Sequence, residues 1–175
     1  MLISLWIPRL LLFIILSSIV GCGYHFTNSQ SANGIGSSRS IWIPFFKNET
    51  VNSTAQTVLR RAFYDELHAL RGLTTSENEE SADIVVKAKI ISFSNTAVSY
   101  SALDQVKEFR LDLNLELEIL DKSKKLPLWR GQLQGSKQYP ANTNLSLQHN
   151  SEDLALDAAA RIIAHKFITS TEESY

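Results

Sequence analysis

The sequence predicts an α+β domain in which two helices pack on one face of a four-stranded sheet, mostly antiparallel or mixed. Apolar and polar residues alternate strictly over 109–120, and two segments, 54–71 and 151–168, space their apolar residues three and four apart. The order strand, helix, three strands, helix is typical of two-layer α+β domains. It excludes a transmembrane barrel, which needs at least about eight strands, and a doubly wound fold, which needs a strand after each helix.

Residues 1–21 are predicted to be a secretory signal peptide. Arg9 precedes an apolar run over 10–20, and the small residue Gly21 follows it. A transmembrane anchor is the alternative, and it needs about 20 apolar residues. Extending the run toward the N-terminus would place Pro8 and Arg9 inside the bilayer, at a high cost in free energy. A cleaved signal is therefore the favoured interpretation.

The signal ends in a pattern that resembles the bacterial lipobox, Ile-Val-Gly-Cys over residues 19–22. The resemblance implies that Cys22 becomes a multiply acylated first residue, whereas the alternative is a small buried thiol. Each acyl CH₂ in lipid contributes about 0.8 kcal/mol, so several chains anchor firmly. Gly23 follows Cys22. An Asp at this position would resemble an inner-membrane retention signal, so its absence indicates the outer membrane. We expect a lipidated cysteine and flexible tether over 22–40, since 28–40 is rich in Ser, Asn and Gly.

A single folded domain is predicted over 41–170. It opens with a strand over 41–46 that lies at an edge or ends near Pro44, because proline donates no ladder hydrogen bond. A turn at 47–50 leads to the first helix, which Asn52, Ser53 or Thr54 can cap and Gly72 can end. The polar face of this helix carries both charge signs, so packing on a sheet is favoured over lying on a membrane.

The second half of the domain is predicted to be a long meander and a closing helix. A strand covers 82–94, and residues 95–104 either extend it or form a turn. The alternating strand turns at 121–125 and returns over 126–139 as a hairpin that overhangs the core, because its strands exceed the usual five or six residues. Asn150 or Ser151 can cap the last helix, whose predicted buried stripe is Ala155, Ala158, Ala159, Ile162, Ile163 and Phe167. Residues 171–175 form a frayed tail.

Composition and motifs argue against catalysis and against nucleic-acid binding. The charges nearly cancel, with 17 Lys+Arg against 18 Asp+Glu, so there is no basic face for nucleic acid. One cysteine excludes an intramolecular disulfide, and four scattered histidines share no ligand spacing, so we expect no metal site and no cofactor. Glu116 and Glu118 share a strand face and could form an acid/base pair, but a solvated strand face explains them without catalysis. No enzyme is predicted.

Two polar surfaces are the candidates for binding. The first is the polar face of the alternating strand, which comprises Arg110, Asp112, Asn114, Glu116 and Glu118. The second is the tip of the following hairpin, where Lys122, Lys124 and Lys125 crowd together and could meet phosphates of a lipid head group. The alternative for these lysines is a solubilising turn.

Four segments resemble the LPS-assembly lipoprotein LptE family. Residues 22–26 (Cys-Gly-Tyr-His-Phe) look like the start of its mature chain, and residues 41–50 are similar to its first strand and Asn-x-Thr turn. Residues 81–84 (Ser-Ala-Asp-Ile) resemble the opening of its second strand, and 128–131 (Leu-Trp-Arg-Gly) part of its last strand. The order of elements agrees over nearly the whole mature chain.

The resemblance implies an outer-membrane lipoprotein, anchored through Cys22 on the periplasmic side, that plugs the large β-barrel protein LptD. There it would assist barrel assembly and help pass lipopolysaccharide to the outer leaflet. The polar strand face suits a wet barrel lumen, and the three lysines are guessed lipopolysaccharide contacts. The alternative is an accessory lipoprotein of another periplasmic machine, a cell-wall synthase or a secretion complex, because fold alone does not decide function.

Overall fold

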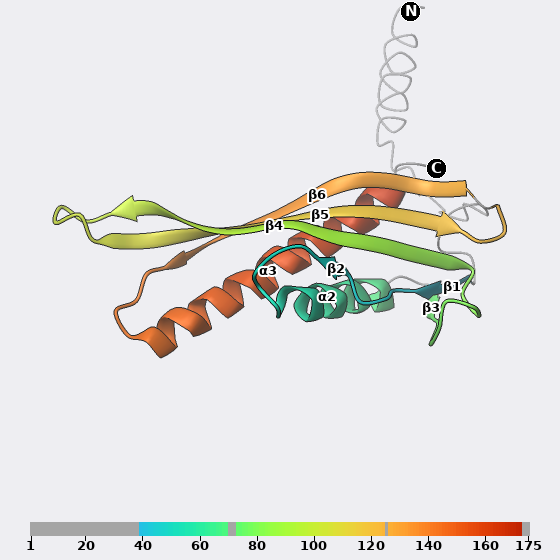
Figure 1. Cartoon of the computed structure of the whole chain (residues 1–175), viewed down its shortest axis with the longest axis horizontal. Helices are drawn as coiled ribbons and strands as arrows, with labels where there is room; N and C mark the ends of the chain where they lie inside the picture. The colour runs from blue at the N-terminus through green and yellow to red at the C-terminus, as the bar shows by residue number, and fades with distance from the viewer. Residues whose placement is uncertain (1–38, 70–72, 125, 173–175) are drawn as a thin grey trace, which may run out of the picture. The chain divides into compact units, whose positions relative to one another are not determined.

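The computed structural model describes residues 39–69, 73–124 and 126–172, and in them two helices cover one face of a mixed sheet (Figure 1). The elements are β1 (Arg39–Trp42), β2 (Lys47–Asn48), α2 (Ala55–Ala69), β3 (Leu73–Thr75), β4 (Ile84–Tyr100), β5 (Val106–Asp121), β6 (Leu126–Pro140) and α3 (Leu145–Glu172). The strands lie in the order β3-β1-β4-β5-β6, and β2 also pairs with β4. The predicted α+β class is confirmed.

Some predictions fall on residues that the structure does not describe. The signal peptide, Cys22 and the tether up to residue 38 lie outside the described residues, as do Gly72, Lys125 and the end of the tail, 173–175.

The predicted count of four strands is wrong, since the described residues contain six. The additional strands, β2 and β3, have two and three residues and pair in parallel with β4 and β1. Segments this short show no period-two pattern. The first strand runs over Arg39–Trp42 and not over 41–46, so its first two residues fall in the predicted tether. It ends just before Pro44, as the missing proline amide predicts. Lys47 and Asn48, predicted as a turn, instead pair with β4.

The long hairpin that leaves the core is β4–β5, and not β5–β6 as predicted. β4 continues to Tyr100, so residues 95–100 extend the strand. Residues 97–108 of the two strands, which we call the finger, project past the helices (Figure 1). The β5–β6 turn closes at the other end of the sheet, where the Asp121 side chain is buried.

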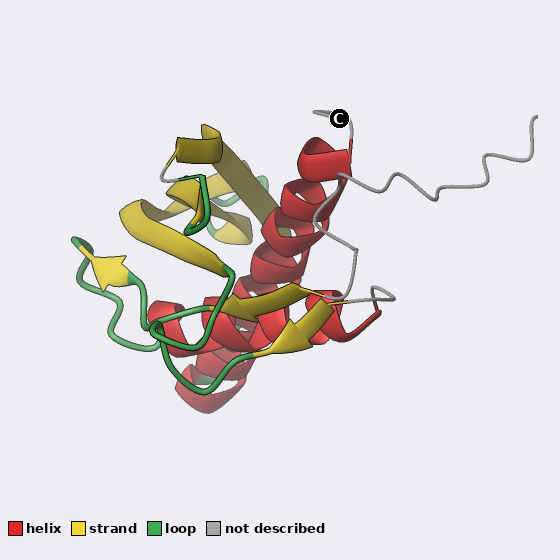
Figure 2. Ribbon diagram, turned by 90° about the vertical axis from the view of Figure 1, so that its right-hand side faces the viewer, coloured by secondary structure: helices red, strands yellow, loops and turns green. Residues whose placement is uncertain are grey.

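The core lies between the sheet and the two helices, as seen along the strands in Figure 2. Every second side chain of β5 from Leu111 to Ile119 is buried, as the alternation predicted. Phe63 of α2 contacts Phe46 (5.3 Å between ring centroids) and Phe167 of α3 (5.0 Å), which joins both helices in one cluster.

The last helix, α3, starts earlier and is turned differently from the prediction. It begins at Leu145, where the Asn144 Oδ1 atom accepts hydrogen bonds from the amides of Ser146 (3.0 Å) and Leu147 (3.3 Å). Neither Asn150 nor Ser151 is its cap, because both lie inside the helix. Since α3 packs on α2 as well as on the sheet, its buried face is wider than predicted and Ile162 is left exposed; the face includes Leu156, Ala160 and Ala164.

Gly135 lets α3 approach β6 closely. A Cβ atom at this position would lie 2.2 Å from the Ala159 carbonyl oxygen and 2.9 Å from Ile163 Cγ1, distances that no side chain tolerates. The glycine therefore fixes where the helix crosses the sheet.

Candidate functional site

The face of the sheet away from the helices is polar along its length. All five residues predicted from the alternation of β5 lie on it in one row, between β4 and β6, and each is at least partly exposed. The neighbouring strands contribute further polar residues to this polar face: Lys87, Lys89, Ser92 and Ser94 from β4, and Arg130, Gln132, Gln134, Ser136 and Gln138 from β6. The structure thus brings the predicted row into the middle of a three-stranded hydrophilic surface.

Charges on the polar face are paired across the strands. Lys89 Nζ lies 3.3 Å from Glu116 Oε2, and Arg130 pairs with Glu118. Hydrogen bonding to Glu116 and attraction to Glu49 raise the pKa of Lys89. These pairs are partly exposed to solvent, so they contribute little to stability. Their effect is to leave a hydrated surface without a dominant charge.

At the free edge of β6 the polar face borders a hollow of about 660 Å³. It is lined by Arg110, Asp112, Gln134, Ser136, Ile162 and Lys166. Lys166 of α3 reaches around the edge and donates a hydrogen bond to the Gln134 carbonyl oxygen (2.8 Å). Arg110 Nε donates to Asp112 Oδ2 at 3.0 Å. The two cations are therefore already engaged within the hollow.

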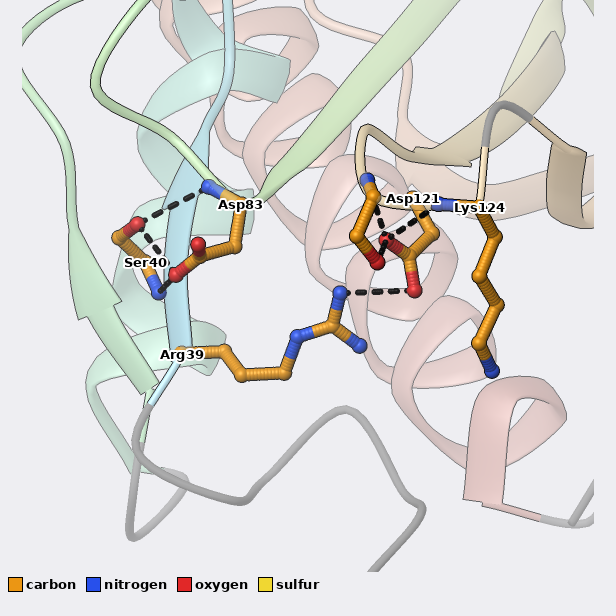
Figure 3. A network of polar contacts seen from close by, with 6 residues as sticks. Arg39, Ser40, Asp83, Asp121 and Lys124 are labelled. Atoms are coloured by element: carbon orange, nitrogen blue, oxygen red, sulfur yellow. Dashed lines mark hydrogen bonds and ion pairs between the residues drawn. The ribbon is translucent and has the colours of Figure 1, made fainter.

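The predicted lysine cluster is only partly gathered. Lys122 Nζ donates to the carbonyl oxygens of Glu79 (2.6 Å) and Glu80 (2.8 Å), which ties the β5–β6 turn to the acidic loop. The side chain of Lys124 is exposed and points away from Asp121 (Figure 3). Of the two described lysines, Lys124 is the one with an ammonium group directed to solvent.

Arg39, the first described residue, forms an ion pair with the buried Asp121. The sequence did not predict this pair. Asp121 is 1% exposed, and its Oδ2 atom lies 2.9 Å from Arg39 Nη2 (Figure 3). The amide and hydroxyl of Ser123 donate to Oδ1 at 2.9 and 2.6 Å. Burial raises the pKa of Asp121, but the hydrogen bonds from Ser123 and Arg39 outweigh it and lower the pKa to about 2. The carboxylate is thus held ionised inside the protein.

Ser40 is held in the same network. Its amide and hydroxyl both donate to Asp83 Oδ2, at 2.8 and 2.7 Å, and these hydrogen bonds lower the pKa of Asp83. The two carboxylates lie at the start of β4 and the end of β5, so the network fastens the start of β1 to the central strands (Figure 3). No local pattern links these positions, which are far apart in the chain.

Membrane-spanning helices and metal-binding clusters are both absent from the described residues. Neither helix there is both long and apolar enough to span a membrane. Over the same ranges, no three His, Cys, Asp or Glu side chains gather in a way that could hold a metal ion.

The chain resembles known proteins in sequence profile and in fold. The family model described as "LptE: Lipopolysaccharide-assembly" matches residues 38–171. No curated protein matches the sequence.

Three solved structures share the fold. A putative lipoprotein from Caulobacter crescentus has a TM-score of 0.55 and 13% identity, over 76% of this chain and 88% of the other. A hypothetical protein from Chlamydia trachomatis has a TM-score of 0.57 and 11% identity, over 79% and 98%. The rare lipoprotein B from Shewanella oneidensis has a TM-score of 0.52 and 12% identity, over 78% and 96%. At these identities the likeness concerns the fold alone.

Proposed function

The chain belongs to the LptE family of lipopolysaccharide assembly, and from this membership we propose that it is a lipid-anchored outer-membrane subunit of the LptD barrel. In this role it assists barrel assembly and helps pass lipopolysaccharide to the outer leaflet, without catalysis. Residues 1–21 are removed as a signal peptide, and Cys22 carries the acyl chains on the periplasmic side. Residues 22–38 tether the folded domain, which begins with β1 at Arg39 and ends with α3 at Glu172. The lipobox-like Ile-Val-Gly-Cys over residues 19–22 supports a lipidated chain.

The observation that carries the proposal is the polar face of the sheet. A barrel lumen is polar and hydrated, and a plug that faces it needs a surface that stays soluble without exposing its core. The row Arg110, Asp112, Asn114, Glu116 and Glu118 supplies such a surface, with its charges paired within the protein. We therefore assign this face to the lumen side of the partner.

Cross-linking in cells tests the assignment. A photoreactive phenylalanine analogue at Gln132, an exposed position on the polar face, is expected to form an adduct with LptD. The same chain carrying Cys22→Ala serves as the control. It should lose its acyl chains by intact mass and yield little of the adduct, because it no longer reaches the barrel. An adduct with a cell-wall synthase or a secretion component, and none with LptD, would overturn the proposal.

The lysines of the β5–β6 turn remain the proposed lipopolysaccharide contacts. Changing Lys122, Lys124 and Lys125 to Glu should weaken binding of lipopolysaccharide in a direct titration, because carboxylates repel its phosphates. Lys124→Glu alone tests the exposed ammonium without breaking the contacts of Lys122 with the acidic loop. Lys47→Glu, at an exposed position in β2, is the matched control. Unchanged affinity in the triple variant removes the assignment.

A further inference from the structure

A second surface, on α2 beside the connection from β1 to β2, holds an arginine between two aromatic rings. Arg60 Cζ lies over the ring of Phe45, 4.6 Å from its centroid, and over the ring of Tyr64, 5.0 Å away. Arg60 Nε donates to the Ile43 carbonyl oxygen (3.1 Å), and the Tyr64 hydroxyl donates to the same oxygen (3.2 Å). We call Phe45, Arg60 and Tyr64 the arginine stack.

The outer ring of the stack is not needed by the core. Phe45 is 62% exposed, whereas the next residue, Phe46, is 2% exposed and packs on Phe63. Val51, in the next connection, between β2 and α2, is 98% exposed. Phenylalanine held outside the core over a guanidinium forms a cation–π contact. Arginine and aromatic side chains displayed in this way are enriched in the hot spots of protein interfaces.

Phe45 is held on both sides along the chain. The Ile43 carbonyl oxygen before it accepts hydrogen bonds from Arg60 and Tyr64, and β2 after it pairs with β4. The Glu49 amide donates to the Ile90 carbonyl oxygen of β4 at 3.1 Å. The ring is therefore positioned before any partner arrives, which lowers the entropy cost of binding.

The charge of the stack defines its ligand. Neighbouring cations already have carboxylate partners. Lys47 Nζ lies 3.0 Å from Glu49 Oε1, and Arg61 Nη2 lies 2.5 Å from Asp157 Oδ1. Among the described residues, no carboxylate forms an ion pair with Arg60. A guanidinium has five N–H donors, and the Ile43 carbonyl and Tyr64 hydroxyl use only part of them. The planar fork of N–H groups on the guanidinium, with one uncompensated charge, suits one carboxylate bound through two parallel hydrogen bonds.

We propose that the arginine stack is a receptor for a single aspartate or glutamate side chain of the barrel partner, with the rings of Phe45 and Tyr64 flanking the contact; this rests on the proposed function. A protein carboxylate carries one charge and two coplanar oxygens, which match the single cation and the planar fork of the stack. The flanking rings hold water away from the guanidinium faces, so the ion pair forms in a partly dehydrated site.

Affinity measurements on the full-length lipidated chain test this. Arg60→Lys keeps the charge but loses the fork and the stacking, and should weaken the complex with purified LptD about tenfold. Phe45→Ser should weaken it in the same direction. Arg61→Lys, the same change one residue further along α2, is the matched control and should bind as the unmodified chain does. If Arg60 acts as a receptor, the thermal midpoint of Arg60→Lys should stay near that of the control. A purely structural role for Arg60 predicts a lower midpoint.

A reciprocal charge exchange identifies the partner carboxylate. A photoreactive phenylalanine analogue in place of Phe45 should form an adduct with an LptD segment that contains Asp or Glu. Arg60→Glu should abolish binding, and Arg at the mapped acidic position should restore it. The inference is overturned if Arg60→Lys binds as tightly as the control, if the mapped segment has no acidic residue, or if the Arg60-dependent binding is to vesicles of phosphatidylglycerol.

The two proposals fail in distinguishable ways. If the cross-linker at Gln132 reaches LptD and Arg60→Lys has no effect, only the receptor is rejected. If no position yields an LptD adduct, both are rejected.

Discussion

Single residues show how the fold accommodates charge at its closed end. Asp121 is the buried charged side chain among the described residues, and it stays ionised because Ser123 and Arg39 satisfy both of its oxygens. Removing one partner of a buried pair costs more than the pair contributes, since the other charge is left uncompensated. The start of β1 therefore depends on a carboxylate from the far end of β5.

The stability that this ion pair contributes should depend on pH. The folded pKa of Asp121, about 2, lies below its usual value of 3.8, so its contribution is present above about pH 4 and is lost as the pH falls toward 2. Asp121→Asn should lower the free energy of unfolding at pH 7 by about 2 kcal/mol. Urea titrations from pH 2 to 7 should show this difference shrinking as the pH falls.

Glu118→Gln is the matched control for that experiment. It removes an exposed pair with Arg130 and should change stability little at any pH. A constant difference between Asp121→Asn and the unmodified chain down to pH 2 would contradict the assignment.

Among the elements, α3 shows how a cap outside the apolar stripe sets the start of a helix. Asn144 precedes the helix by one residue, and its side chain satisfies two amides that have no partner within the first turn. The Gln148 amide then closes the turn on the Asn144 carbonyl oxygen at 2.9 Å. The first turns of α3 expose Leu145 and Leu147, so the apolar stripe gives no sign of them.

The cap position can be tested by substitution. Asn144→Ala should destabilise the protein by about 1 kcal/mol, because the two amides lose their acceptor. Asn150→Ala, the cap predicted from sequence, lies inside the helix and should be neutral or slightly stabilising. Chemical unfolding of the two variants decides between the positions. Destabilisation by Asn150→Ala, with no effect of Asn144→Ala, would place the start of α3 near residue 150 in solution.

For the whole folded domain, the two ends of the sheet differ in how they are supported. The closed end is tied by the network of Arg39, Ser40, Asp83 and Asp121. The opposite end is the finger, which has register shifts at residues 97–100 and exposes Tyr100 and Leu103. Stability should therefore fall from the closed end toward the finger.

Hydrogen exchange measures that gradient. Amides of the finger, residues 97–108, should exchange at least about tenfold faster than amides of residues 111–119 in β5, whose alternate side chains are buried. Mass spectrometry of deuterated peptides from these two ranges gives the comparison within one molecule. Protection of the finger equal to that of 111–119 would show that it has support the isolated domain does not reveal.

The sequence by itself determined the features that local periodicity encodes. The alternation over 109–120 predicted both the buried face of β5 and the five residues of the polar face, because side chains on a strand alternate between two environments. The spacing of apolar residues predicted α2, and Pro44 predicted the end of β1. The resemblance to the LptE family, drawn from four short segments, is confirmed by the family model over residues 38–171.

Only the tertiary structure decided the features that depend on distant partners. β2 and β3 exist because β4 and β1 offer them backbone groups, and the buried face of α3 is widened by its contact with α2. Asp121 meets Arg39, and Phe45 turns outward over Arg60, only once the sheet has formed. Periodicity reports which side of an element is buried, whereas a pair contact depends on how two elements are placed, and that information is not local in the chain.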